Sequence, residues 1–177
     1  IEELLGWYEQ LKGIRYASLR YFNAAGYDLD GKIKGLESEP NNLLPIVMEA
    51  VIGKRSFVEV FGTDYNTPDG SCIRDYIHVN DLADGHVRAL EYLTRETDNP
   101  ILNLGTSNGM SVLEILEHTK NLSHSNFDVR FGSRRLGDPA IVLAKADKAK
   151  SLLGWEAKRS DPKTLINSML NVYRATN

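Results

Sequence analysis

Hydrophobic and polar positions recur along the chain with two different periods, which predict helices and strands in alternation. Apolar residues at positions 1, 4, 5, 8 and 11 have helical spacing, and Gly13 ends that pattern. Residues 14–22 alternate well enough for a strand, which the segment Asn23 to Gly26 is expected to close. Strands and helices that follow each other in this way indicate an α/β protein.

Residues that favour the start of a helix locate the later elements. Asn41 and Asn42 offer N-cap chemistry, Asn80 is a cap candidate, and Ser111 with Glu114 has the spacing of a capping box. The expected helices cover residues 43–52, 81–93, 112–120 and 147–153, with a last helix opened by Ser160, Asp161 and Pro162. The expected strands cover residues 57–61, 73–79, 101–104 and 127–131, with an extended segment after Pro139.

Composition excludes several kinds of partner. A chain of 177 residues with 42% hydrophobic residues is long enough for one domain with a core. The formal net charge of −3, spread over interspersed acidic and basic residues, predicts no nucleic-acid or membrane partner. The single cysteine, Cys72, excludes an intrachain disulfide, and the four histidines lack metal-ligand spacing. We therefore expect a cytoplasmic protein without a metal site.

The first predicted helix begins without a cap. No Ser, Thr, Asp or Asn stands before Ile1 to accept from the first free N–H groups. We expect that residues upstream are missing from the sequence. The alternative is a processed natural terminus whose first turn is frayed.

Four segments place polar groups where ligands bind in α/β proteins. They are Tyr21 to Asn23 at a strand end, Asn41 to Leu43 at a helix start, Arg74, and the loop 134–138. Each also has a plain structural interpretation: a strand cap and turn, two helix caps, an ion pair of Arg74 with Asp75 or another carboxylate, and a solvated loop. The loop Gly105 to Gly109 looks like a phosphate cradle, but its glycine spacing is wrong and we interpret it as a turn.

Together the four segments favour a nucleotide sugar. The planar fork of arginine matches phosphate oxygens bidentately, so Arg74 and Arg135 suit a diphosphate. Asp138 suits vicinal ribose hydroxyls, and an asparagine at a strand end, Asn23, suits a sugar hydroxyl.

Several motifs of the chain occur in the same order in one enzyme family. They are RYFNAAG, PNNLLP, VFGTDYNTPDGSCIRDYIHVNDLADGH, NLGTSNGMSVLEI, RRLGDPA and KAKSLLGW. The element D-Y-x-T-x-D-G-S-x-x-R-D-Y-I-H-V, which begins at Asp64, is long and specific. On these motifs nearly the whole chain resembles the UDP-glucose 4-epimerases, members of the extended short-chain dehydrogenase/reductase superfamily.

The resemblance implies that cofactor binding and catalysis belong mainly to a part of the enzyme upstream of this chain. Such epimerases begin with a Rossmann half that binds most of the NAD, followed by a catalytic Tyr-x-x-x-Lys that is expected just upstream of Ile1. No catalytic residue is therefore assigned to this chain. Residues 1–25 would be the tail of the Rossmann domain, and residues 26–177 mainly the UDP-sugar-binding domain, with segments around 73–105 returning to the Rossmann domain. The family forms homodimers, which we do not predict for a fragment.

The resemblance also implies roles for individual residues. The residues implied to contact ligands are Tyr21 and Phe22 at the nicotinamide, Asn23 at the diphosphate or hexose, Asn42 and Leu43 at the phosphates, Glu59 to Phe61 at the uracil, Arg74 and Arg135 at the diphosphate, Asp138 at the ribose, and Val142 in the hexose pocket. The rigid loop before Arg74 would aim its guanidinium at a phosphate in advance.

In the family reaction, hydride passes from C4 of the sugar to NAD and returns to the other face of a 4-keto intermediate. We expect that the isolated fragment is inactive. The alternatives are a non-catalytic nucleotide-sugar-binding module, a related dehydratase or glucuronate epimerase, and a folded fragment without any ligand. Val142, where some members have tyrosine, raises the hypothesis that UDP-N-acetylglucosamine is also accepted.

Overall fold

The fold is α/β, as the alternating pattern predicts. The structure is a computed structural model that describes residues 1–176. The helices are α1 Glu2–Lys12, α2 Leu43–Val51, α3 Val79–Arg95, α4 Val112–Ser123, α5 Asp147–Leu153 and α6 Pro162–Ala175. The strands are β1 Ser18–Tyr21, β2 Asn23–Ala25, β3 Phe57–Phe61, β4 Ile73–Arg74, β5 Tyr76–His78, β6 Ile101–Leu104, β7 Met110–Ser111, β8 Asp128–Gly132 and β9 Ile141–Val142.

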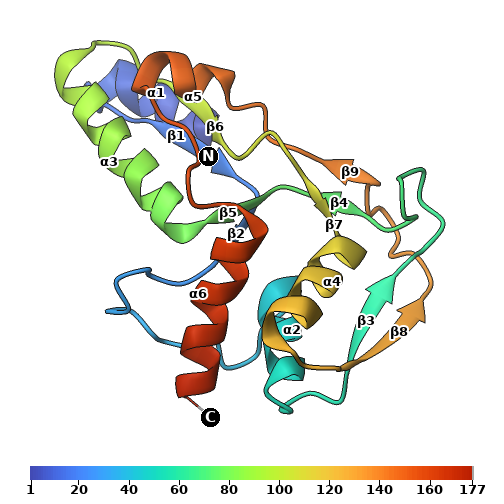
Figure 1. The fold of residues 1–177 in the computed structure, drawn as a ribbon. Helices are drawn as coiled ribbons and strands as arrows, with labels where there is room; N and C mark the ends of the chain where they lie inside the picture. The colour runs from blue at the N-terminus through green and yellow to red at the C-terminus, as the bar shows by residue number, and fades with distance from the viewer. Residues whose placement is uncertain (177) are drawn as a thin grey trace.

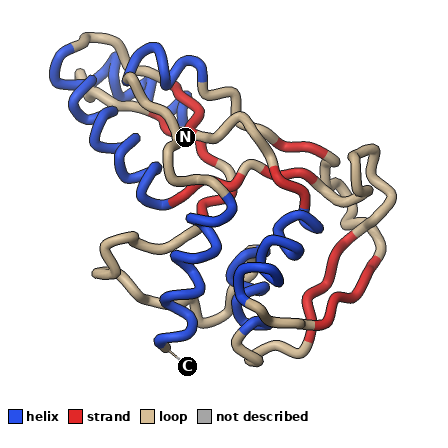
Figure 2. The backbone as a smooth tube through the Cα atoms, viewed as in Figure 1, coloured by secondary structure: helices blue, strands red, loops and turns tan. Residues whose placement is uncertain are grey.

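The strands form small sheets that are mostly parallel. β1 pairs with β6, β2 with β5, and β3 with β8, all in parallel. β4 lies between β7, which is antiparallel to it, and β9, which is parallel. In Figure 1, α1, α3 and α5 gather around β1 and β6, while α2, α4 and α6 lie together at the other end, beside the β3–β8 ribbon. Figure 2 shows β5 and β2 in the middle, between these two groups of helices.

The strand β5 joins two hydrophobic cores. Its three residues are all buried, and successive side chains of a strand point to opposite faces. Tyr76 packs into the core formed by α2, α4 and α6, whereas Ile77 packs into the core formed by α3, β6 and α5. A third core lies between α2, α4 and β3. The nearly continuous apolar sequence of α2 follows from this position, because the helix contacts two cores at once.

Local chemistry explains most helix boundaries. Gly13 adopts the left-handed conformation, with φ of 66°, and ends α1 as predicted. The capping box of Ser111 and Glu114 is present at the start of α4, which continues to Ser123 rather than ending at residue 120. Asp161 caps α6 by accepting a hydrogen bond of 2.9 Å from the Thr164 N–H group.

Several predicted boundaries are wrong. Asn23 does not begin the closing turn of the first strand, because residues 23–25 form β2 and pair with β5. The cap of α3 is His78 rather than Asn80: the Nδ1 atom of His78 accepts a hydrogen bond of 3.0 Å from the Asn80 N–H group. Asn42 is the N-cap residue of α2, but its side chain makes no capping hydrogen bond.

Candidate functional site

Arg74 and Asp138, two residues predicted from separate motifs, are in direct contact. They form an ion pair although they are 64 positions apart, and their side chains are 15% and 28% exposed. The other guanidinium branch of Arg74 donates a hydrogen bond of 2.8 Å to the Ile73 carbonyl oxygen. An ion pair of Arg74 with Asp75 is therefore wrong, but the plain alternative of a pair with another carboxylate is confirmed, because Arg74 faces Asp138.

Arg135 reaches the same region from the end of β8. Its guanidinium lies 3.9 Å from the centroid of the Phe61 ring, and Phe61 is the last residue of β3. The loop after β8 then turns at Gly137, where φ is 80°, and the Asp138 N–H group donates to the Arg135 carbonyl oxygen at 3.2 Å. This turn brings the chain back to Arg74. Four of the predicted residues therefore lie in one region: Arg74, Asp138, Arg135 and Phe61.

Asn23 and Val142 meet at Asp75. The Asn23 N–H group donates to the Asp75 carbonyl oxygen, and the Asp75 N–H group donates to the Val142 carbonyl oxygen, both at 3.1 Å. The N–H and C=O groups of one extended residue point to the same side of a strand. Asn23 and Val142 therefore lie next to each other, one residue along the chain from Arg74.

The loop that precedes β4 is held by its own side chains. Asp69 accepts hydrogen bonds of 2.8 Å from the Ser71 N–H and hydroxyl groups, and a further one from the Ser111 hydroxyl group. Burial alone would raise the pKa of the Asp69 carboxyl, but these hydrogen bonds outweigh it and lower that pKa. At Gly70, a Cβ atom would lie 2.1 Å from the Thr63 carbonyl oxygen. The loop is thus closely packed, as the prediction for Arg74 requires.

Within residues 1–176, three further predicted residues, Asn42, Leu43 and Glu59, make no side-chain hydrogen bond or ion pair with Arg74, Arg135 or Asp138 that would tie them to the same site. Leu43, the first residue of α2, packs partly buried against two cores. Asn42 is exposed and lines a pocket of about 470 Å³ beside β2 and α6. Glu59 is exposed on β3, opposite Arg130 of β8, which agrees with a side chain that a uracil would not need.

Tyr21 and Phe22 lie at the carboxyl end of β1. They are 47% and 40% exposed, and the Tyr21 ring packs edge-on against His86 at a centroid distance of 6.0 Å. The spacing Tyr-x-x-x-Lys also occurs within the chain, at Tyr8 and Lys12. Because Glu2, in the first turn of α1, pairs with Arg20 near the end of β1, the last turn of α1 lies toward the opposite end of that strand. This arrangement places Lys12, at the far end of α1, away from Tyr21 and Phe22.

Two buried acidic residues were missed by sequence reasoning. Asp75 accepts hydrogen bonds from the loop Gly105 to Gly109, at the N–H groups of Thr106 (2.9 Å) and Ser107 (3.2 Å). The loop is thus a cradle that holds the chain's own carboxylate, which confirms its interpretation as a structural turn. Asp81 binds the Arg159 side chain and the Ser160 hydroxyl group. No local signal identifies either residue, because their partners are remote in the sequence.

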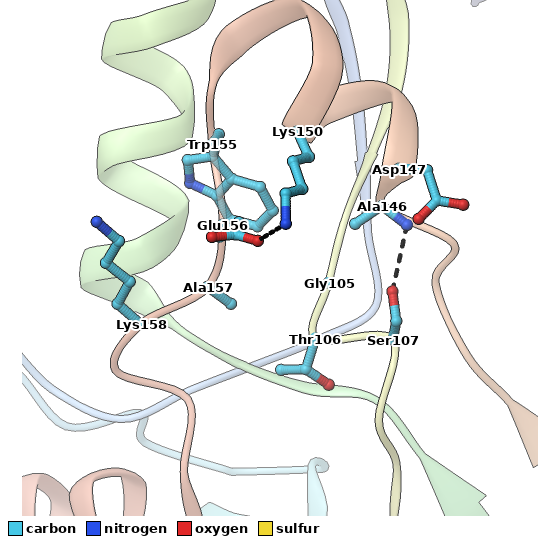
Figure 3. A pocket seen from close by; sticks show the side chains of 10 residues that line it. All are labelled: Gly105, Thr106, Ser107, Ala146, Asp147, Lys150, Trp155, Glu156, Ala157 and Lys158. Carbon is cyan, nitrogen blue, oxygen red and sulfur yellow. Dashed lines mark hydrogen bonds and ion pairs between the residues drawn. The ribbon is translucent and has the colours of Figure 1, made fainter.

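A separate pocket of about 370 Å³ lies beside α5 (Figure 3). Its lining includes the ion pair of Lys150 with Glu156 and the ring of Trp155, whose Nε1 atom donates to the Asp81 carbonyl oxygen at 3.0 Å. None of the predicted ligand-contact residues lines this pocket.

Residues 1–176 contain no group of three or more His, Cys, Asp or Glu side chains placed to hold a metal ion. Over the same residues, no helix is both long and apolar enough to cross a membrane. Cys72 is a buried free thiol.

Comparison with known proteins agrees with the motifs. Residues 1–105 match the model of the NAD dependent epimerase/dehydratase family. A UDP-glucose 4-epimerase of Halalkalibacterium halodurans is 41% identical over 98% of this chain and 52% of its own length. The chain spans about half the length of the curated relatives it matches.

Solved structures of such epimerases have the same fold. The UDP-glucose 4-epimerase of Brucella ovis in complex with NAD is 41% identical, with a TM-score of 0.93 over 97% of this chain and 53% of that one. The UDP-Glc/GlcNAc 4-epimerase of Campylobacter jejuni is 34% identical, with a TM-score of 0.82 over 98% of this chain and 53% of that one. From its matched residues and its fold, the chain belongs to the NAD dependent epimerase/dehydratase family.

Proposed function

We propose that this chain is the UDP-sugar-binding portion of a UDP-glucose 4-epimerase, which interconverts UDP-galactose and UDP-glucose. The main support is the convergence of Arg74, Asp138, Arg135 and Phe61 from three separate segments. Two guanidinium groups beside a carboxylate and an aromatic ring match the parts of a nucleoside diphosphate: two phosphates, a ribose and a base.

The proposed roles follow from this match. Arg74 and Arg135 bind the diphosphate, with further phosphate contacts from the start of α2 at Asn42 and Leu43. Asp138 accepts from the ribose hydroxyl groups. The backbone from Glu59 to Phe61 frames the uracil.

The hexose is proposed to lie between Asn23 and Val142, which neighbour each other at Asp75. The reaction requires that either face of the sugar be presented, so the sugar should be held loosely while the nucleotide is held firmly. The arginines supply that firm hold, because hydrogen bonds to charged groups contribute about 1.5–3 kcal/mol each.

The residues at the end of β1 fit a nicotinamide. Tyr21 and Phe22 are exposed aromatic side chains at the carboxyl end of a parallel strand, where open α/β sheets bind their ligands. NAD, when bound, supplies a reversible acceptor for hydride. In this proposal the chain orients the sugar and the nicotinamide toward each other, and none of its residues is assigned a catalytic role.

The domain division remains part of the proposal. The pairing of β1 with β6 supports assigning residues 1–25 and the segments around 73–105 to the NAD-binding unit. Residues 26–177 outside those segments would form the substrate-binding unit. The free thiol of Cys72 is compatible with a cytoplasmic location.

Calorimetric titration of the chain with UDP tests the proposal. Arg74→Ala and Arg135→Ala should each weaken UDP binding by roughly ten- to a hundredfold, since each removes charged hydrogen bonds to a phosphate. Arg130→Ala is the matched control, because Arg130 lies in β8, just before the loop that carries Arg135, and likewise stacks on an aromatic ring, that of Phe57, at 3.8 Å. No binding of UDP, or equal losses in all three variants, would reject the assignment.

Conversion of UDP-galactose to UDP-glucose tests the larger claim. Since the chain spans about half the length of its relatives, we propose that it binds UDP but does not interconvert the sugars by itself when NAD is supplied. A longer polypeptide that adds the sequence corresponding to the rest of those relatives should be active. Inactivity of both would favour the non-catalytic binding module instead.

Val142 supports a wider substrate range. A valine leaves more room beside Asn23 than the tyrosine found at this position in some family members, so UDP-N-acetylglucosamine should also bind. Val142→Tyr should lower the affinity for UDP-N-acetylglucosamine by at least about tenfold while leaving that for UDP-galactose within about threefold. Equal effects on both ligands would reject this role for Val142.

A further inference from the structure

Asp75 is fully buried and lies between β4 and β5. Its carboxylate accepts four hydrogen bonds: one oxygen binds the Thr106 N–H (2.9 Å) and hydroxyl (2.7 Å) groups, and the other binds the N–H groups of Ser107 (3.2 Å) and Ala144 (3.1 Å). A buried carboxylate is tolerated only when such donors replace water. Every donor here comes from a segment remote in the sequence.

These donors belong to the segments that continue into both neighbours of β4. Thr106 and Ser107 lie in the loop that leads into β7, and Ala144 lies two residues after the end of β9. Arg74 pairs with Met110 of β7 on one side and with Val142 of β9 on the other. The Asp75 carboxylate thus binds the segments next to both strands that flank Arg74, β7 and β9.

The loop is closely fitted around this carboxylate. A Cβ atom at Gly105 would lie 2.3 Å from the Ala144 Cβ atom and 2.7 Å from an Asp75 carboxylate oxygen. Ser107 adopts a positive φ of 59°, and its hydroxyl group donates to the Ala144 carbonyl oxygen at 3.0 Å. A non-glycine residue with positive φ is uncommon and is stabilised by its surroundings. Removing the charge of Asp75 should therefore loosen the whole arrangement.

We propose that Asp75 is a positioning residue for the diphosphate. Its carboxylate holds β7 and β9 against β4 and so sets the direction of the Arg74 guanidinium, although Asp75 itself is too deeply buried to contact a ligand. The inference rests on the proposed function, because it assumes that Arg74 binds a phosphate.

Comparing UDP with UMP, which lacks the second phosphate, separates positioning from general stability. In Asp75→Asn, an amide NH₂ group replaces one oxygen and faces N–H donors of the loop or of Ala144. The affinity for UDP should fall about tenfold and that for UMP less than about threefold, because a misdirected Arg74 no longer binds the charged second phosphate. Asp81→Asn is the control: Asp81 is also a buried carboxylate, but its partners are Arg159 and Ser160. It should lower stability without changing the ratio of the two affinities.

A double-mutant cycle tests whether Asp75 acts through Arg74. Residues in one network give non-additive effects, so Asp75→Asn combined with Arg74→Ala should bind UDP no more weakly than Arg74→Ala alone. Additive losses, or equal losses of UDP and UMP affinity in Asp75→Asn, would overturn the inference.

A milder variant covers the case in which Asp75→Asn does not fold. Thr106→Val keeps the side-chain shape and removes one of the four hydrogen bonds to Asp75, together with the contacts of the Thr106 hydroxyl group with the Asn108 backbone. UDP affinity should fall about two- to threefold with UMP affinity unchanged. If Arg74→Ala weakens UDP binding while both Thr106→Val and Asp75→Asn leave it intact, only this inference fails. If the unmodified chain does not bind UDP, the proposed function fails as well.

Discussion

Gly70 shows how a single residue can fix the loop before Arg74. Its φ of 79° favours glycine, and a Cβ atom there would meet the Thr63 carbonyl oxygen at 2.1 Å. Gly53 has a similar φ of 77°, but a Cβ atom added there would have no neighbouring atom within 4 Å, so it makes a matched pair with Gly70.

Alanine at these two glycines should therefore have unequal effects. Both variants incur about 1 kcal/mol for the left-handed backbone, and Gly70→Ala should lose at least ~2 kcal/mol more because Thr63 has to move. Urea unfolding of both variants measures the difference. Similar losses would show that the loop adapts, and would remove the argument that it aims Arg74 in advance.

His78 makes the stability of the fold depend on pH. The side chain is fully buried, and burial lowers the pKa of its imidazole below the usual 6.5. Unfolding exposes the imidazole, so below pH 6.5 the unfolded chain binds more protons than the folded one, and stability falls as pH falls. The carboxylates with lowered pKa, such as Asp69, lose their contribution only below about their ordinary 3.8.

Thermal unfolding measured between pH 7.5 and about 5 tests whether stability falls as the pH falls. The melting temperature should decrease from about pH 6.5 downward, and His78→Asn should show a shallower decrease even if its melting temperature is lower throughout. Equal slopes in both proteins would mean that His78 is not the titrating group.

At the residue scale, the sequence suggests candidates for the site by residue type but does not show which of them pair. Arg74, Arg135 and Asp138 could be selected because the planar fork of arginine matches phosphate oxygens and a carboxylate suits ribose hydroxyl groups. Which carboxylate faces Arg74 could not be selected, since Asp75 is adjacent in sequence and Asp138 is adjacent only after β8 and the turn at Gly137 have formed.

Among the elements, those with local signals were predicted best. The strands at 57–61 and 101–104 and the helix at 147–153 have the expected bounds, because alternation and helical spacing are properties of the segment itself. The strand β2 was missed because Asn23, Ala24 and Ala25 have no strand propensity, and pairing with β5 makes them extended. The early start of α3 at Val79 likewise depends on the ring of His78 as its cap.

The capping box of α4 gives a prediction at the scale of one element. Glu114 accepts a hydrogen bond of 2.7 Å from the Ser111 N–H group, and Glu114→Ala should lower the free energy of unfolding by about 1 kcal/mol. Glu114→Gln retains an acceptor and is the control, with a loss of less than about half as much. Urea unfolding compares them. A full loss in the glutamine variant would assign the effect to charge near the helix start rather than to the hydrogen bond.

For the whole molecule, the site depends on how the two groups of helices are joined. Only Asp75 separates Arg74 from β5, which contributes Tyr76 to one core and Ile77 to the other. The proposed sugar contacts Asn23 and Val142 are attached to the same strand through Asp75. A movement of the helices α2, α4 and α6 relative to α1, α3 and α5 would therefore reach the site through this strand. The sequence predicts only one continuous strand here, residues 73–79.

The helix α1 leads to a prediction about self-association. None of its residues is buried, and Leu4, Trp7, Tyr8 and Leu11 form one exposed apolar face at helical spacing, between 46% and 74% exposed. Within residues 1–176, β1 pairs only with β6, so the other edge of β1 is also unpaired. An apolar face of this kind promotes association in water.

Sedimentation velocity should therefore show larger species as the concentration of the chain increases. The double variant Trp7→Glu with Leu11→Glu should shift the distribution toward the monomer, because charged side chains oppose burial of this face. Its affinity for UDP should stay within about twofold, since α1 has no part in the proposed site. Val87→Glu, on the exposed face of α3, is the matched control for adding a charge at an exposed apolar residue of a different helix. A chain that stays monomeric at every concentration would refute the role of α1, and a larger shift in the Val87 variant would place the associating surface on α3 instead.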